Sequence, residues 1–151
     1  ILLVVAALIF FPELLSDVAE AAQLTYASST LGSVDKAAKL NELDRLMRED
    51  KLFQNENLNL GLLAETLDLS SHQLSELINT EFGFGFSRYM REQRVAEAKH
   101  LLVNDTKSSV LAISMMTGFK SQSNFYAGFR EITGEAPGTF RKRHTQPHTS
   151  S

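Results

Sequence analysis

Two stretches decide the fold of this chain: LAETLDLSSHQLSELI at residues 63–78 and ISMMTGFKSQSNFYAGF at residues 113–129. They carry the same order of apolar and small residues, and the second has one extra residue in its middle. Each stretch predicts two short helices joined by a tight turn. The chain therefore contains two copies of one helical unit. Tandem helical hairpins also occur in plain helical bundles, so the repeat alone does not establish a function.

The paired positions indicate how each unit packs. In a helix-turn-helix, apolar residues hold the two helices at about 90–120°, and a small residue lets their backbones approach. Ala64 and Ser114 are small residues at corresponding positions of the two stretches. The apolar residues that would clamp the helices also correspond, as Leu63 with Ile113, Leu74 with Phe125, and Ile78 with Phe129.

A helical spacing of apolar residues extends outward from the two units, and no stretch alternates as a strand would. The predicted helices cover residues 36–51, 60–67, 71–82, 86–103, 109–117, 121–132 and 138–143. A helix over 86–103 is about 27 Å long, a little shorter than one turn of duplex DNA at about 34 Å. Such a rod could set two recognition helices into successive major grooves. We predict an all-α fold of two helix-turn-helix subdomains joined by a central linker helix.

Composition restricts the possible functions. The 151 residues include no Cys, which excludes disulfides, thiolate metal sites and cysteine nucleophiles. The formal net charge of −3 argues against a nucleic-acid partner. The charge is segregated, however, because residues 36–87 carry 5 basic and 9 acidic side chains whereas residues 88–151 carry 10 basic and 5 acidic ones. This distribution favours a nucleic-acid partner for the second half.

The two ends of the chain have a different character. Ile1–Phe11 is wholly apolar, and we expect it to be the cytoplasmic end of a truncated transmembrane helix, because eleven helical residues span about half a bilayer core. A buried helix of a further soluble domain, or a peripheral strand or tail, would also fit. No Lys or Arg precedes Lys36, so the positive-inside rule gives no support. Residues 12–35 are interpreted as a linker, and residues 144–151 as a disordered tail.

The order and spacing of many residues resemble the DNA-binding domain of the AraC/XylS family of bacterial transcription regulators. The first unit matches as Leu63-Ala64-x-x-Leu67-x-x-Ser70-x-x-x-Leu74-x-x-Leu77-Ile78. The second matches as Ile113-Ser114-x-x-x-Gly118-Phe119-x-x-x-Ser123-x-Phe125-x-x-x-Phe129-Arg130, followed by Gly134-x-x-Pro137-x-x-Phe140-Arg141. Three departures are mild: Ser114, Ala136 and Phe140 stand where Ala, Thr and Tyr are usual.

The resemblance implies a sequence-specific DNA-binding regulator that is coupled to an upstream sensor. Its DNA-binding domain would cover residues 36–143, with helix-turn-helix units at about 60–82 and 109–132. The implied partners are double-stranded DNA, RNA polymerase and a second copy bound through the region ahead of the chain. Residues 36–151 would be cytoplasmic, and the full-length protein would be anchored in the bacterial inner membrane. The family's motif positions also imply which side chains contact DNA.

Side chains that face away from the apolar positions would read the bases. Glu76 can accept from cytosine N4, His72 can donate to guanine, and Gln122 can pair bidentately with adenine. The predicted base contacts are His72, Gln73, Ser75, Glu76, Gln122, Ser123, Tyr126 and Ala127. The predicted phosphate contacts are Ser70, Arg88, Arg91, Lys120, Ser121, Asn124, Arg130 and Arg141. Arg94 is expected to be structural and to pair with a carboxylate.

The sequence carries no enzyme motif of the phosphate-loop, zinc-protease or nucleophile-elbow kind. We therefore expect no catalysis, no cofactor and no metal site. A helical protein-interaction module of a membrane receptor, without DNA binding, remains an alternative. The two functions differ in one observable property, because only the regulator predicts duplex binding that weakens steeply with salt.

Overall fold

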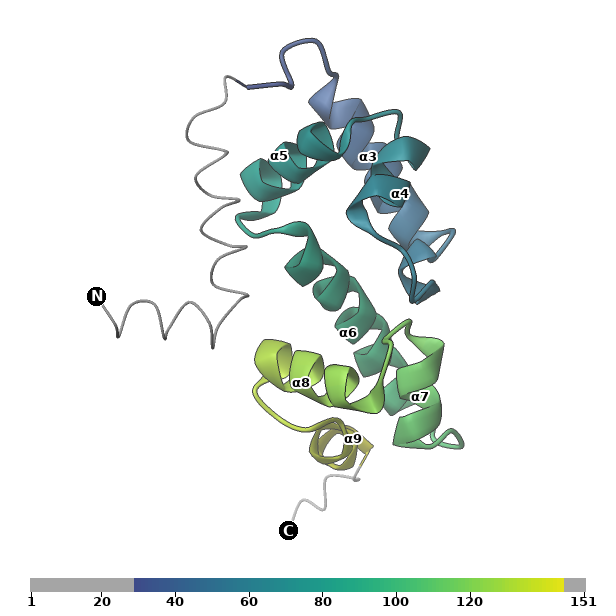
Figure 1. Ribbon diagram of the computed structural model, residues 1–151. Helices are drawn as coiled ribbons and strands as arrows, with labels where there is room; N and C mark the ends of the chain where they lie inside the picture. Colours follow the sequence, from purple (N-terminus) through teal and green to yellow (C-terminus); the bar gives the residue numbers. More distant parts are fainter. Residues whose placement is uncertain (1–28, 146–151) are drawn as a thin grey trace, which may run out of the picture.

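The computed structural model describes residues 29–145, and all regular elements within them are helices (Figure 1). This confirms the predicted all-α class. The elements are α3 (Lys36–Arg48), the 3-10 helix η1 (Leu52–Gln54), α4 (Leu60–Thr66), α5 (Ser71–Phe82), α6 (Phe86–Asn104), α7 (Val110–Met116), α8 (Gln122–Thr133) and α9 (Pro137–Thr145). The predicted apolar helix over residues 1–11 lies outside the described residues.

The two helix-turn-helix units repeat each other in length and in local chemistry. Helices α4 and α7 have 7 residues each, and α5 and α8 have 12 each. The hydroxyl oxygens of Ser70 and Ser121 accept main-chain hydrogen bonds at the start of α5 and α8. Both helices end at a glycine in the left-handed region, Gly83 at φ 76° and Gly134 at φ 80°. A glycine there stops a helix without the strain that a Cβ would bring.

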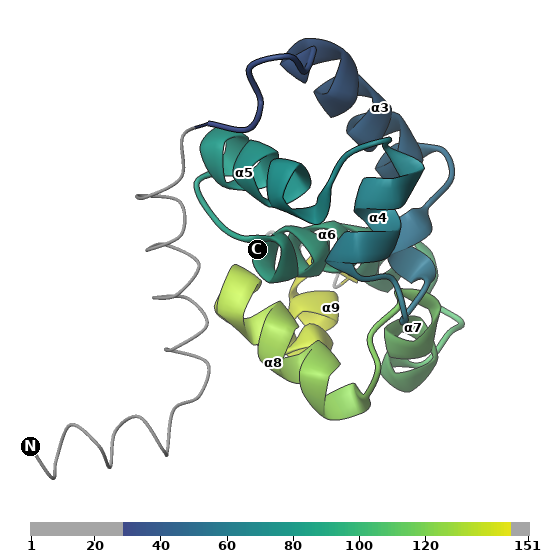
Figure 2. The same cartoon turned by 45° about the horizontal axis from the view of Figure 1, so that its top comes forward.

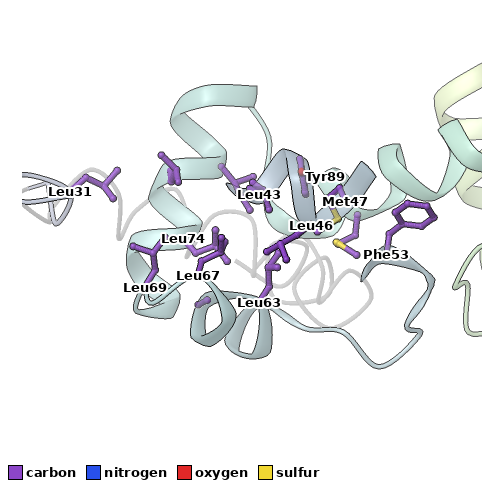
Figure 3. Packing of buried hydrophobic residues seen from close by; sticks show 14 residues of the cluster. Leu31, Leu43, Leu46, Met47, Phe53, Leu63, Leu67, Leu69, Leu74 and Tyr89 are labelled. Carbon is purple, nitrogen blue, oxygen red and sulfur yellow. The ribbon is translucent and has the colours of Figure 1, made fainter. Parts of the chain in front are cut away.

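Two hydrophobic cores form, one for each unit. The first gathers α3, α4 and α5 around Leu43, Leu63 and Leu74, and Figure 3 shows its side chains with Leu31 at one edge. The second gathers α7, α8 and α9 around Phe125 and Phe129, both fully buried. Helix α6 serves both cores, with Tyr89 and Met90 in the first and Val95, Ala98 and Leu102 in the second.

Helix α6 runs between the two units and sets their relative position (Figure 1). Both second helices, α5 and α8, lie on the same side of α6, whereas α4 and α7 lie on the other side (Figures 1 and 2). Arg94 joins α6 to the first unit, because its Nε donates to the Phe53 carbonyl at 2.9 Å and its terminal nitrogen to the Asn55 carbonyl at 3.1 Å. The structural role expected for Arg94 is thus present, but its partners are main-chain carbonyls and not a carboxylate.

Two predicted helix limits differ from the structure by more than one residue. Helix α3 ends at Arg48, because Lys51 adopts the left-handed region at φ 49° and η1 follows it. Helix α9 continues to Thr145, so the prediction of a disordered tail was wrong for residues 144 and 145. The His144 ring packs on the Phe140 ring, with centroids 4.0 Å apart. Residues 146–151 lie outside the described residues.

Within residues 29–145, none of the helices combines the length and apolar character that crossing a membrane requires. The expected membrane segment, Ile1–Phe11, and most of the expected linker fall outside the described residues.

Candidate nucleic-acid interface

Helix α8 presents an open polar face. Its buried side is formed by Phe125, Gly128 and Phe129, which pack into the second core. The predicted base-contacting residues all lie on its exposed side, namely Gln122, Ser123, Tyr126 and Ala127. Within the described part of the chain, the side chains of Gln122, Ser123 and Tyr126 form no hydrogen bond, and Tyr126 is 37% exposed. These groups are therefore available to a ligand.

Helix α5 presents a comparable face that is partly covered. The predicted base-contacting residues His72, Gln73, Ser75 and Glu76 share its outward side, but each is only partly exposed. The Gln73 side chain accepts from the Ser70 main-chain nitrogen at 3.0 Å and donates to the Thr30 carbonyl at 3.1 Å. The Glu76 carboxylate accepts from the main-chain nitrogen of Thr30 at 3.0 Å and from its hydroxyl at 2.8 Å.

The same contacts alter the chemistry of Glu76. Hydrogen bonds from the Ser29 hydroxyl, and then from the main chain and hydroxyl of Thr30, hold the pKa of the Glu76 carboxyl below its usual value. A carboxylate that accepts several hydrogen bonds is stabilised in its charged form. Glu76 therefore stays ionised at neutral pH, with its oxygens directed at residues 29 and 30.

The predicted phosphate-contacting cations fall into two groups. Lys120 and Arg130 are exposed and form no ion pair within residues 29–145. Arg88 and Arg91 instead face Glu131 of α8, at 3.8 Å from Arg88 and 3.0 Å from the Arg91 Nε. These two arginines fasten α8 to α6 and have part of their charge neutralised. The sequence analysis missed Glu131, because a lone glutamate on a helix does not indicate which cation it meets.

A hollow of about 590 Å³ separates the two units beside α8. Its walls include Arg91 and Arg94 from α6, Lys120 from the turn before α8, and Asn124 and Ala127 from α8. Glu56 and Glu131 also line it, so its charge is mixed. Ser70 and Ser121 are exposed at the starts of α5 and α8. Exposed helix N-termini and nearby cations form a surface suited to phosphate groups.

The structure gives Arg141 a different role from the predicted phosphate contact. Its Nε donates to the Leu102 carbonyl and its terminal nitrogen to the Asp105 carbonyl, both at 3.1 Å. These carbonyls belong to the end of α6, where main-chain acceptors have no partner within the helix. The Arg141 guanidinium therefore caps α6 and ties α9 to it. The motif match could not show this, because any exposed carbonyl can accept from an arginine.

Replacement of Arg141 should therefore reduce stability more than it changes ligand binding. For Arg141→Ala we expect a loss of about 2 kcal/mol in the free energy of unfolding, since hydrogen bonds from a charged donor are lost and two carbonyls are left unpaired. Arg143→Ala on the same helix is the control, because the exposed Arg143 forms a surface ion pair with Glu135 and lies over the Phe140 ring at 5.8 Å, and its loss should cost under about 1 kcal/mol. Equal denaturation midpoints for the two variants would contradict the assignment.

The chain is similar to known proteins in both sequence and fold. A family model described as a helix-turn-helix domain matches residues 63–143. The chain is 30% identical over 101 residues to the probable transcription factor PqrA of Proteus vulgaris. The matched stretch covers 67% of this chain and 82% of PqrA. It is 29% identical over 85 residues to the arabinose operon regulatory protein of Escherichia coli K12. This matched stretch covers 56% of this chain but only 29% of that longer relative.

Two solved structures share the fold. A transcriptional regulator from Chromobacterium violaceum, described as containing an AraC-type DNA-binding domain, is 26% identical with a TM-score of 0.58, over 72% of this chain and 98% of that one. The DNA-binding domain of AdpA, solved with a target DNA, has a TM-score of 0.61 over 70% of this chain and 90% of that one. At 19% identity, the second likeness shows the fold alone.

Proposed function

Because this chain belongs to the AraC/XylS family of helix-turn-helix DNA-binding transcription regulators, we propose that it sets α5 and α8 into successive major grooves on one face of duplex DNA. The observation that carries this proposal is the placement of both helices on the same side of α6 (Figure 2). Helix α6 has 19 residues, which makes it about 28 Å long, close to one duplex turn of about 34 Å. The AdpA domain, which has the same fold and was solved with a target DNA, supports DNA binding by this fold.

Base reading is assigned to the outward faces of the two helices. On α8, the Gln122 amide can pair with the adenine edge, and Tyr126 can reach a phosphate or a thymine methyl. Ser123 adds a hydroxyl, and Ala127 offers only apolar contact. On α5, His72 and Glu76 can complement guanine and cytosine, with Gln73 and Ser75 beside them. Because the base-contacting residues of α8 are exposed and those of α5 only partly exposed, we expect α8 to bind DNA before α5.

Phosphate contact is assigned to the cations and helix starts around these faces. Lys120 and Arg130 are unpaired within the described residues and supply full charges. Ser70, Ser121 and Asn124 lie at helix N-termini, where main-chain dipoles favour anions. Arg88 and Arg91 would contribute only by exchanging Glu131 for a phosphate.

The test separates base reading from phosphate contact. DNA is first selected from random duplexes with the intact chain, and affinity is then measured by gel shift at several salt concentrations. Gln122→Ala should lose about tenfold in discrimination at one base pair. Lys120→Ala should weaken every sequence alike and reduce the salt slope by about 1. Lys107→Ala, in the loop before α7, is the charge-matched control and should leave both quantities unchanged. Failure to select any sequence at low salt would refute the proposal.

The complete regulator is proposed to contain more than this DNA-binding part. The arabinose regulator is about three times longer than the stretch that this chain matches, which supports a further domain that senses a signal. We assign that role to the region ahead of the described residues, together with pairing of two copies. Contact with RNA polymerase is proposed for the bound state, with residues 36–151 in the cytoplasm.

A further inference from the structure

The two recognition helices differ in one respect that their sequences do not explain. Helices α5 and α8 have the same length, the same serine cap and the same glycine stop. Nevertheless, the reading face of α8 is open, whereas that of α5 is partly buried. The covering groups come from residues 29–31, directly ahead of α3, which we call the latch segment.

The latch segment satisfies the atoms that would otherwise meet bases. The main-chain nitrogen and hydroxyl of Thr30 both donate to one oxygen of Glu76, at 3.0 and 2.8 Å. The Thr30 carbonyl accepts from the Gln73 amide nitrogen at 3.1 Å. The Gln73 amide still has a second hydrogen and the Glu76 carboxylate a second oxygen, but these contacts hold both side chains against Thr30, and both are only partly exposed on the face that would read bases.

The latch segment is also anchored by an apolar residue. Leu31 is 2% exposed and belongs to the first core, at the edge seen in Figure 3. Its carbonyl accepts from the Val34 main-chain nitrogen at 3.0 Å, which closes a turn just ahead of the α3 cap Asp35. The segment is therefore held by one buried side chain and four polar contacts, and it leads directly into α3.

We propose that the latch segment is an autoinhibitory contact, which withholds α5 from DNA until the chain ahead of residue 29 draws it away. This inference rests on the proposed function, since it requires α5 to read bases. In the latched state only α8 can bind, so the chain engages one major groove. Release exposes Gln73 and Glu76 together, and the second groove is then read. A signal needs only to favour the released state in order to shift this equilibrium.

The latched state can be fixed covalently and reversibly. The chain contains no Cys, so Thr30→Cys combined with Glu76→Cys introduces a single pair of thiols in place of side chains that touch. In the full chain, mild oxidation should join them, and hydroxyl-radical footprinting on the selected duplex should then show protection of the α8 half-site alone. Reduction should restore protection over both half-sites. Both states lack Glu76, so its loss cancels from the comparison.

The released state is favoured by removing the anchor. Leu31→Ala should tighten binding to the selected duplex about tenfold, as expected when a state populated at about one part in ten becomes dominant. Gly32→Ala is the control in the same turn, since its added methyl meets no atom within 4 Å, and it should bind like the unaltered chain. Hydrogen exchange of α5 amides in each variant verifies that the first unit stays folded.

The outcomes separate the inference from the function on which it rests. Identical two-site footprints in the oxidised and reduced states would overturn the latch while leaving DNA binding intact. A Leu31→Ala variant that binds the selected duplex no more tightly than Gly32→Ala would overturn it as well. If no form of the chain protects any duplex, the proposed function fails and the inference fails with it.

Discussion

Replacement of Gly118 by alanine is expected to lower the free energy of unfolding by about 4 kcal/mol, the upper end of the range for single substitutions. An added Cβ would lie 2.1 Å from the Phe53 carbonyl oxygen and 2.9 Å from the Gln54 Cα. Both neighbours are main-chain atoms, so no side-chain rotation relieves the clash. Gly118 also has φ +87°, where an L side chain is strained.

The neighbouring main chain has little freedom to move away. The Phe53 carbonyl oxygen accepts the Arg94 Nε hydrogen bond at 2.9 Å, and the Phe53 side chain is buried in the first core. A shift that admits the methyl group would break the contact through which α6 holds the two units together. We therefore expect Gly118→Ala to lose two-site DNA protection along with stability.

Gly134→Ala separates the clash from the backbone strain. Gly134 has φ +80°, close to the value at Gly118, but a Cβ there would meet no atom within 4 Å. Its replacement should cost only about 1–2 kcal/mol. Chemical denaturation of both variants measures the difference. Equal losses would show that the turn at Gly118 moves easily and that the approach of Phe53 is unimportant.

Gly118 and Asp68 show which features of a turn can be predicted from the sequence and which cannot. The two residues hold equivalent turn positions, and Asp68 adopts the left-handed region at φ 54° without being glycine. The turn therefore does not itself require glycine, and the requirement at 118 comes from the Phe53 main chain. The sequence pattern predicts the turn, because turn chemistry is local. It cannot predict an approach between segments that are distant in the sequence.

The same limit applies to the candidate site. Helical spacing placed Phe125 and Phe129 in the core and the α8 polar residues outside, as the structure has them. This works because one apolar stripe fixes both faces of a helix. The partners of Arg94 and Arg141 were not predicted, since their acceptors are main-chain carbonyls, which every residue carries. The cover over α5 was missed for the same reason, because Thr30 engages Gln73 and Glu76 largely through its main chain.

Phe125→Ala is expected to lower the free energy of unfolding of the second unit by about 3–5 kcal/mol. Phe125 is fully buried, and its ring lies 5.3 Å from the Phe119 ring and 5.8 Å from the Phe129 ring. Its removal leaves a cavity at the centre of a small core, where few side chains can move in. Hydrogen exchange of α7 and α8 amides should accelerate, and footprinting should lose the α8 half-site.

The matched variant is Leu74→Ala, at the corresponding position of the first unit, which should cost about 2–5 kcal/mol there and leave α8 protected. Because α6 supplies different residues to each core, Tyr89 and Met90 to one and Val95 and Leu102 to the other, damage to either core should stay at its own end of α6. Faster exchange in both units after either substitution would mean that α6 transmits the disruption along its length. In that case the two units would unfold as one cooperative body.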